Sequence, residues 1–267
     1  MNTALDARIL SDIAISLARQ AGDMAQAGRK SGTVTAATKS SSIDMVTVFD
    51  KASEALITQG LAEVRPHDGI IGEEGARDEG TSGITWHIDP IDGTTNFLFD
   101  IPMWAVSIGA VDDHGPIAGA VYIPALGEMF SAARGHGSYL NDAPITARVT
   151  PSISEALVAT GFSYDIRARA PHAQRVALML DHVRDIRRMG AAAIDLCFVA
   201  AGRLDAYFEE GLNSWDLVAG QIIATEAGAV VTDFHGNPVR PQQVLACSPT
   251  LHHDFISLID KCARMTS

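Results

Sequence analysis

Cysteine is scarce in this chain of 267 residues, which contains only Cys197, Cys247 and Cys262. The three form neither a CxxC pair nor another metal-ligand spacing, so a disulfide framework and a zinc site are both disfavoured. We expect structural thiols in a reducing compartment, and we therefore predict a cytoplasmic protein. Basic residues are also few: 20 Lys and Arg face 32 Asp and Glu, a formal net charge of −12. This excess of negative charge makes nucleic acids and anionic membrane surfaces unfavourable partners.

Long apolar runs and several well-known catalytic motifs are absent as well. No apolar run approaches the ~20 residues that span a bilayer, and Asp6, Arg8 and Asp12 interrupt the first segment. We expect neither a secreted nor a membrane-spanning protein. The sequence has no GxxxxGK[ST], HExxH or GxSxG motif, which excludes several classes of nucleotide, zinc and serine-hydrolase site. Gly135-His136-Gly137 is half of a dinucleotide fingerprint, and we interpret it as a hairpin turn.

The composition that remains is that of a folded protein, with 47% hydrophobic and 19% charged residues. The length suits one large domain or two closely packed lobes. Helices followed by antiparallel strands are predicted up to about Ala147, whereas strands and helices alternate beyond it. We therefore expect an N-terminal α+β lobe over residues 1–147 and a C-terminal α/β lobe over residues 148–267, with a shared core.

Hydrophobic periodicity places the individual elements. It predicts a helix over roughly the first 27 residues and a second helix from Asp44, its expected N-cap, to Pro66. Short strands are expected at 69–75 and 84–90, and an antiparallel meander at 104–141. Helices of the second half are predicted over 173–183, 191–201, 215–227 and about 250–264.

Carboxylates gather at the ends of the two short strands. Glu73 and Glu74 follow the first strand, and Asp89 and Asp92 end the second in the sequence WHIDPIDGTTNF. The D-P-I-D spacing allows a turn to bring Asp89, Asp92 and the Ile91 carbonyl toward one point, and such hard oxygen ligands are those that Mg²⁺ selects. Either segment alone also fits a solvated turn, because Asp and Pro are turn formers. Their combination favours a divalent-cation site.

Two further segments bear on this site. Gly93-Thr94-Thr95-Asn96 is expected to begin a short helix, whose free N–H groups favour an anion such as phosphate beside the metal. Asp216 is expected at the start of a later helix, where its alternative role is an N-cap or a first-turn charge.

These residues resemble the signature segments of the inositol monophosphatase family, in the same order and over nearly the whole chain. The matching segments are Glu73-Glu74, the string Asp89-Pro90-Ile91-Asp92-Gly93-Thr94-Thr95-Asn96, and Trp215-Asp216-Leu217-Val218-Ala219-Gly220. Weaker matches are Lys39 to Asp44 with Asp50 beyond it, and Gly190-Ala191-Ala192-Ala193 followed by Glu209. The resemblance implies a layered α-β-α-β-α sandwich that is usually dimeric.

The resemblance also implies a cluster of two to three Mg²⁺ ions. Glu73, Asp89 and the Ile91 carbonyl would hold one ion. Asp89, Asp92 and Asp216 would hold a second, and Glu73 with waters a third, weaker one. Glu73 and Thr94, with Thr94 oriented by Asp50, would activate a water molecule. Asp50 and Thr94 otherwise fit an exposed helix charge and a helix cap.

Substrate recognition is implied at a third set of positions: Asp92, Gly93, Thr94, Gly190, Ala191, Ala192, Glu209 and Asp216. Ala191 departs from the family, in which Ser or Thr commonly stands there. We expect a phosphatase for myo-inositol 1-phosphate or a similar small phosphorylated polyol. The alternatives are a phosphatase for histidinol phosphate, fructose 1,6-bisphosphate or an adenosine 3′,5′-bisphosphate, and a regulatory binding protein without turnover.

Overall fold

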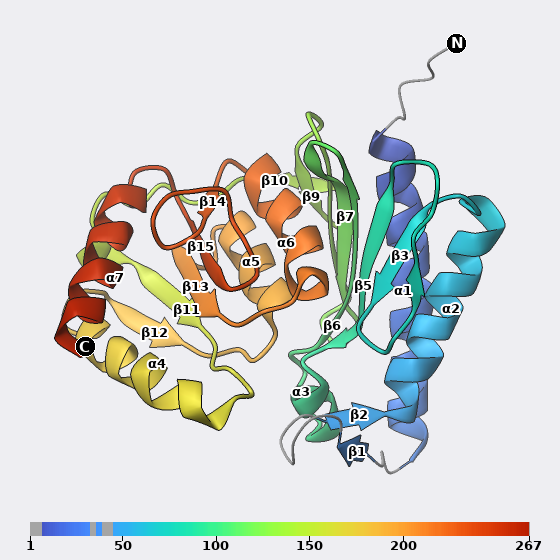
Figure 1. Ribbon diagram of the computed structural model, residues 1–267, viewed down its shortest axis with the longest axis horizontal. Coiled ribbons are helices and arrows are strands. Elements are labelled where there is room, and N and C mark those ends of the chain that lie inside the picture. The colour runs from blue at the N-terminus through green and yellow to red at the C-terminus, as the bar shows by residue number, and fades with distance from the viewer. Residues whose placement is uncertain (1–6, 33–35, 39–44, 267) are drawn as a thin grey trace.

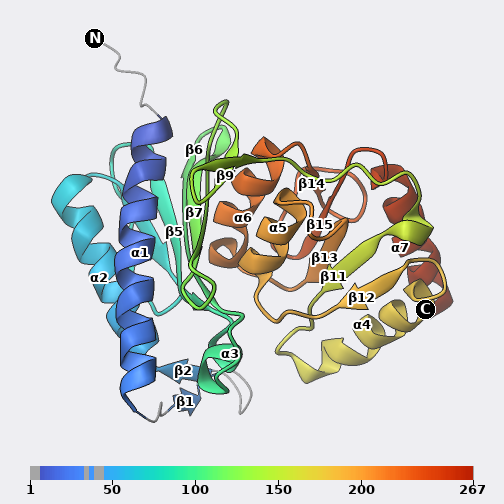
Figure 2. The same ribbon diagram turned by 180° about the vertical axis from the view of Figure 1, so that it is seen from behind.

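Five layers of alternating helices and sheets make up this computed structural model, which describes residues 7–32, 36–38 and 45–266 (Figures 1 and 2). Helices α1 (Ala7–Ser31) and α2 (Val48–Val64) cover the outer face of the first sheet. Helices α5 (Ala192–Ala200) and α6 (Ser214–Glu226) lie between the sheets, and α4 (Ile166–Met179) and α7 (His252–Thr266) cover the second sheet. The predicted α-β-α-β-α sandwich is confirmed.

The first sheet has eight strands in the order β10-β9-β8-β7-β6-β5-β3-β4. All neighbours are antiparallel except β3 and β5, which are parallel. The strands are β3 (Gly69–Gly72), β4 (Arg77–Asp78), β5 (Thr85–Asp92), β6 (Ala105–Asp112), β7 (Gly115–Ile123), β8 (Glu128–Ala133), β9 (Ser138–Leu140) and β10 (Ala143–Ile145). The run from β6 to β9 is the predicted meander, and Gly135-His136-Gly137 forms its last turn.

The second sheet has five strands in the order β12-β11-β13-β15-β14, with β11 parallel to both of its neighbours. Its strands are β11 (Leu157–Thr160), β12 (Asp185–Arg187), β13 (Ala206–Glu210), β14 (Val230–Thr232) and β15 (Gln243–Cys247). A separate pair, β1 (Ala36–Thr38) and β2 (Met45–Thr47), precedes α2, and a 3-10 turn, η1 (Ile153–Glu155), precedes β11. The residues on either side of position 147 thus belong to different sheets.

Two helix boundaries differ from the sequence-based prediction. The N-cap of α2 is Thr47, whose hydroxyl accepts the Phe49 N–H, while the predicted cap Asp44 lies outside the described residues. The helix predicted over 173–183 is α4, which begins after Asp165 and ends at Met179. Asp165 caps it by accepting the Arg167 N–H at 3.0 Å, and this cap permits an early start even though Pro171 lies inside the helix.

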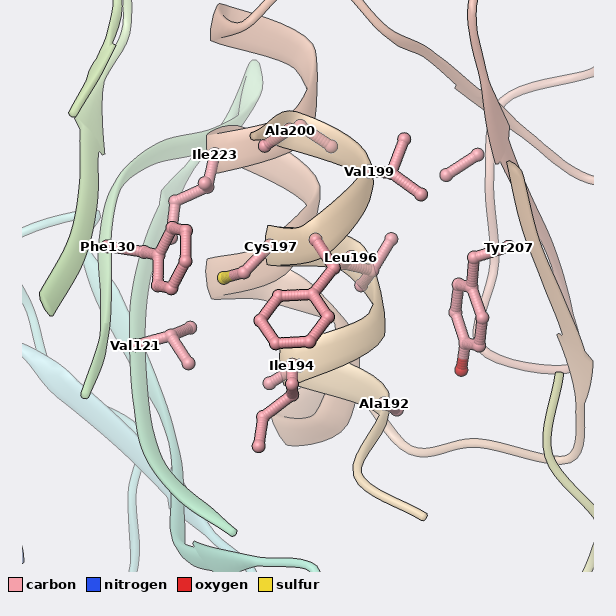
Figure 3. Packing of buried hydrophobic residues seen from close by; sticks show 14 of the residues in the cluster. Val121, Phe130, Ala192, Ile194, Leu196, Cys197, Val199, Ala200, Tyr207 and Ile223 are labelled. Atoms are coloured by element: carbon pink, nitrogen blue, oxygen red, sulfur yellow. The ribbon is translucent and has the colours of Figure 1, made fainter. Parts of the chain in front are cut away.

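The central layer supplies most of the core between the sheets. All nine residues of α5 are buried, because one side of the helix packs on the first sheet and the other on the second. Figure 3 shows Phe130 and Val121 on one side of α5 and Tyr207 on the other. The three cysteines are buried thiols, as expected. In the described part of the chain, no helix is long and apolar enough to cross a membrane.

Helix α6 approaches the first sheet closely at a glycine. A Cβ atom on Gly109 of β6 would lie 2.5 Å from Val218 Cγ1 and 2.7 Å from the Ala219 backbone nitrogen. The missing side chain therefore sets how near α6, and Asp216 in its first turn, can come to β5 and β6.

We expect Gly109→Ala to lower the free energy of unfolding by about 1–3 kcal/mol, because the added methyl group must push helix backbone away from the sheet. Chemical denaturation measures the change. Gly32→Ala is the matched control, since no atom lies within 4 Å of the added Cβ there. Equal stability of the two variants would show that α6 does not depend on this contact.

Candidate functional site

A cavity of about 230 Å³ opens where both sheets and the central helices meet. Its walls come from the ends of β3 and β5, the segments after β11 and β13, and the first residues of α5 and α6. Five carboxylic acids line it, namely Glu73, Asp89, Asp92, Glu209 and Asp216. The volume lies just below the ~300 Å³ at which pockets for drug-sized ligands begin, so a small ligand fits it best.

Strand register brings Glu73 next to Asp89. Parallel pairing places Gly72 opposite Ile88, and the Glu73 N–H donates to the Ile88 carbonyl at 3.1 Å. Because the carboxyl ends of parallel strands meet at one edge of a sheet, the residue after each strand shares that edge. The predicted gathering of these two acids follows from this pairing.

A bulge at Pro90 and Ile91 shapes the rest of this wall. Asp89 pairs with Ser107 and Asp92 with Ala105, so three steps on β5 face two on β6. Proline cannot donate to the strand ladder and is tolerated at such a bulge. The Asp89 side chain accepts the Ile91 N–H at 3.0 Å. Asp89, Ile91 and Asp92 all reach the cavity.

Asp216 joins these acids from a different part of the chain. It is the third residue of α6, and its Oδ2 accepts the Asn213 N–H at 2.7 Å, which is the capping role left open by the sequence. The same carboxyl group lines the cavity with Asp89, whose pKa its charge raises. Asp216 therefore caps its helix and faces the acidic cluster at once.

Two hydrogen bonds fix the start of α6 to the first sheet. His87 Nδ1 lies 2.8 Å from Ser214 Oγ, and the Ser107 hydroxyl donates to the Trp215 carbonyl at 3.3 Å. Burial lowers the pKa of His87 to about 4. Its imidazole is therefore neutral at physiological pH and serves as a hydrogen-bonding link rather than as a charge.

The electrostatic consequence of this gathering is large. Burial raises the pKa of Asp89 well above its usual value, and the charges of Glu73, Asp92 and Asp216 raise it further. Burial and Asp216 likewise raise the pKa of Asp92, and burial raises that of Asp216 to about 6. The carboxylates hold protons more tightly than free side chains do, so a positive charge at this place would be strongly favoured.

The donor set consists of carboxylate oxygens and one peptide carbonyl, which suits Mg²⁺ better than zinc. Within the described residues, no three His, Cys, Asp or Glu side chains already surround one point as metal ligands. Mg²⁺ usually takes one or two carboxylates and keeps several waters. A complete protein cage is therefore not required, and the acidic cluster fits this ion.

Thr94 lies at the floor of the cavity, and Asp50 lies behind it. The Thr94 hydroxyl is 3.2 Å from Asp50 Oδ1 and 3.1 Å from the Ile91 carbonyl. Asp50 is fully buried and accepts the Thr47 N–H at 2.8 Å and the Thr47 hydroxyl through Oδ2. Burial raises the pKa of Asp50 to about 6, although the hydrogen bonds from Thr47 oppose the shift. Asp50 touches Thr94 as the resemblance implied and caps α2 as well.

The second half contributes Gly190, Ala191, Ala192 and Glu209 to the cavity wall. Ala191 is the N-cap of α5 and has no side chain that can cap it. Asp92 takes over this function, because its Oδ2 accepts the Ala193 N–H at 2.7 Å. The buried Tyr207 hydroxyl donates to Glu209 Oε2 at 2.7 Å and orients that carboxylate.

Sequence reasoning missed two residues on α2 that hold the acidic wall in place. The Ser53 hydroxyl donates to the Pro90 carbonyl at 3.1 Å. Glu54 accepts the Glu74 N–H at 2.8 Å and the Ala76 N–H at 2.9 Å, and a Cβ on Gly72 would meet it at 2.3 Å. With Asp50, they form one buried face of α2 at spacings of three and four residues. That amphipathic spacing was a usable signal, but the sequence-based prediction assigned no role to Ser53 or Glu54.

Further cavity residues were also missed. Arg188 precedes the Gly190-Ala191 segment, and Tyr164 lies in the loop after β11. Asn213 and Trp215 flank the start of α6. Trp215 belongs to a segment that the sequence had singled out, and Arg188 and Asn213 each lie two residues before such a segment. Tyr164 reaches the cavity through long-range pairing that no local pattern indicates.

Comparison with known proteins gives a consistent result. Residues 6–264 match the Inositol monophosphatase family. The chain is 46% identical over 217 residues to an inositol-1-monophosphatase of Mycobacterium bovis, covering 78% of this chain and 74% of that protein. It is 39% identical over 242 residues to a Vibrio cholerae protein named Nus factor SuhB, covering 89% and 91%. The solved inositol monophosphatase of Anabaena superposes with a TM-score of 0.85 at 33% identity, covering 95% of this chain and 96% of that one.

Replacement of Glu54 tests the role of α2 in holding the wall. We expect Glu54→Ala to lower the free energy of unfolding by about 3 kcal/mol, because two backbone N–H groups lose a charged acceptor. Glu63→Ala, on the exposed side of the same helix, should change it by less than about 0.5 kcal/mol. Denaturant titration compares them, and a similar small effect of both would contradict the assignment.

The pKa of Asp216 predicts a pH dependence of stability in chelator-treated protein. Since its folded pKa of about 6 lies above the ordinary 3.8, the folded state loses stability as pH rises from about 4 to 6. Asp216→Asn keeps an oxygen acceptor for Asn213 but cannot ionise. Between pH 4.5 and 7.5, the wild type should therefore lose on the order of 1 kcal/mol more stability than this variant. If the stability of both proteins changes with pH in the same way, the pKa of Asp216 is not raised in the folded state.

Proposed function

The chain belongs to the inositol monophosphatase family, and from that membership we propose that it is an Mg²⁺-dependent phosphomonoesterase. The proposed substrate is myo-inositol 1-phosphate or a similar small phosphorylated polyol. The observation that carries the proposal is the convergence of Glu73, Asp89, Asp92 and Asp216 on one cavity beside Thr94. Buried like charges at this density require a cation to offset them.

Glu73, Asp89 and the Ile91 carbonyl would hold one Mg²⁺, and Asp89, Asp92 and Asp216 a second. A third, weaker ion would lie on Glu73 and waters. When bound, the ions would supply positive charge beside the phosphate and lower the pKa of a coordinated water. The acids that bind them come from both halves of the chain, residues 1–147 and 148–267, which we propose act as two lobes around one site.

The chain's own residues would position the nucleophile. The Thr94 hydroxyl is oriented by Asp50 on one side and by the Ile91 carbonyl on the other. In the proposed reaction, Thr94 and Glu73 hold the attacking water, and its proton passes to the Glu73 carboxylate. Gly93 and Thr94 bind the phosphate oxygens, so no covalent intermediate with the protein is needed.

Recognition of the polyol would fall to the second half. Glu209, held by Tyr207, would accept hydroxyl hydrogen bonds together with Asp92 and the backbone of Gly190, Ala191 and Ala192. A site built around such bonds discriminates against analogues that lack the hydroxyl groups. Ala191 supplies no hydroxyl of its own, which supports a broader preference among polyol phosphates than for one inositol isomer.

The same fold is also compatible with other substrates and with a second function. Histidinol phosphate, fructose 1,6-bisphosphate and adenosine 3′,5′-bisphosphate remain alternative substrates. Relatives named Nus factor SuhB, among them one 37% identical over 94% of this chain, favour a second candidate function as a regulatory binding protein. We also propose a homodimer, which the family resemblance implies, and we propose no nucleic-acid or membrane partner, since the net charge is −12.

We expect the purified protein to release phosphate from myo-inositol 1-phosphate only when Mg²⁺ is present. Asp89→Asn should lower kcat/KM at least about 100-fold, because the removed charge serves both proposed ions. Asp113→Asn, at an exposed position, is the control and should leave the rate unchanged. A panel containing histidinol phosphate and the two bisphosphates ranks the substrates by kcat/KM. If the protein releases phosphate from none of these compounds, the proposed phosphatase function is wrong and the regulatory binding protein is favoured.

A further inference from the structure

Arg188 is the single cationic side chain among the described residues that line the cavity. It lies between β12 and the start of α5, next to the Gly190 backbone. A Cβ on Gly190 would meet Arg188 Nη1 at 2.4 Å, so the guanidinium lies directly over this residue. The acidic cluster of the proposed reaction uses none of its five N–H donors.

The guanidinium group of Arg188 has N–H donors available for a ligand. Arg188 is exposed and forms no ion pair or hydrogen bond with any residue that the structure describes. Its neighbour Arg187 differs, since Nη1 of Arg187 lies 2.6 Å from Asp185 Oδ2. An arginine at a cavity wall without an ion-pair partner is suited to a planar or tetrahedral anion, which it can bind through two parallel N–H donors.

The charge of Arg188 acts on two residues of the cavity wall, Glu209 and Tyr164. Burial raises the pKa of Glu209, and the charge of Arg188 opposes that shift. Burial likewise raises the pKa of Tyr164 to about 12, with Arg188 again opposing it. Glu209 lies near the end of β13, and Tyr164 lies in the loop after β11. The guanidinium thus lies near Gly190 and Glu209, two of the proposed polyol contacts.

Neutralisation of Glu209 does not account for this arginine. The Glu209 carboxylate already accepts the Tyr207 hydroxyl at 2.7 Å, and no oxygen of it lies within ion-pair distance of Arg188. A counter-charge evolved for one carboxylate would be expected to contact it, because the interaction weakens quickly with distance and exposure to water.

We propose that Arg188 forms a subsite for a second phosphate group on the substrate. This inference rests on the proposed phosphatase function and refines its substrate class to phosphate monoesters that carry another phosphate on the part that is not hydrolysed. The reacting phosphate binds beside Thr94, the hydroxyl groups contact Glu209, and the second phosphate takes the free N–H donors of Arg188.

The test compares fructose 1-phosphate with fructose 1,6-bisphosphate, which share a sugar and differ by one phosphate. Initial rates with Mg²⁺ are measured for the wild type and for Arg188→Gln, Arg188→Lys and Arg187→Gln, and chromatography of the sugar product identifies the phosphate that leaves. Arg188→Gln should lower kcat/KM for the bisphosphate at least about 10-fold more than for the monophosphate, since a charge-assisted contact is lost only there. The loss for Arg188→Lys should be intermediate, because lysine keeps the positive charge but lacks the two parallel N–H donors of a guanidinium group.

Arg187→Gln is the matched control and should leave the ratio of the two kcat/KM values unchanged. Raising the salt concentration should reduce the preference of the wild type for the bisphosphate over the monophosphate, because salt screens the charge of Arg188. The ratio of the two kcat/KM values for Arg188→Gln should not change. An equal loss on both substrates, or no loss on either, would overturn the subsite. If the wild type hydrolyses neither compound, calorimetry of their binding decides separately: a preference for the bisphosphate that Arg188→Gln removes supports the subsite, and its absence rejects it.

Discussion

Electrostatic repulsion among the carboxylates of Glu73, Asp89, Asp92 and Asp216 acts against the folding of this chain, and the architecture around them is arranged to overcome it. Asp89 and Asp92 are almost fully buried, where the charged form of a carboxyl group is least stable. Helix packing, strand pairing and capping hydrogen bonds all hold these groups together. An energetic cost of this kind is typical of functional sites. Under the proposed function, the same negative potential would attract a cation and, through it, a phosphate ester.

The same local motif, a capping box, orients two of the acidic side chains. Asp50 and Asp216 each stand third in a helix and each accept the N–H of the residue before that helix begins, which fixes the side chain against its own backbone. In both cases the carboxyl group also reaches beyond the helix, toward Thr94 in one and Asp89 in the other. A capping box is formed by residues that are close in sequence, so it fixes the orientation of the acidic side chain without long-range contacts.

How much of this could be predicted from the sequence depended on the range of the interactions. The segment from Asp89 to Asn96 is continuous, and its turn chemistry and family resemblance together located most of the acidic wall before the structure was known. The role of Glu54 could not be predicted in this way, because the backbone N–H groups that donate to its carboxylate lie 20 and 22 residues away, after β3. Arg188 lies two residues before the Gly190-Ala191 segment, but no local pattern indicates that its side chain reaches the cavity. The start of α4 was missed for a different reason, since the predicted range 173–183 did not include the N-cap at Asp165.

Asp92 shows why the two halves must be considered together. It lines the cavity with the acids of the first sheet, and it also accepts the Ala193 N–H, which the cap residue Ala191 cannot satisfy. Any displacement of α5 therefore moves a proposed metal ligand, and any change of charge at Asp92 alters the first turn of α5. Asn96 strengthens this link by donating to the Met103 and Met189 carbonyls. Because the segment that carries Gly190 is attached to the acidic wall in this way, a substitution that displaces this segment would also move the proposed metal ligand Asp92.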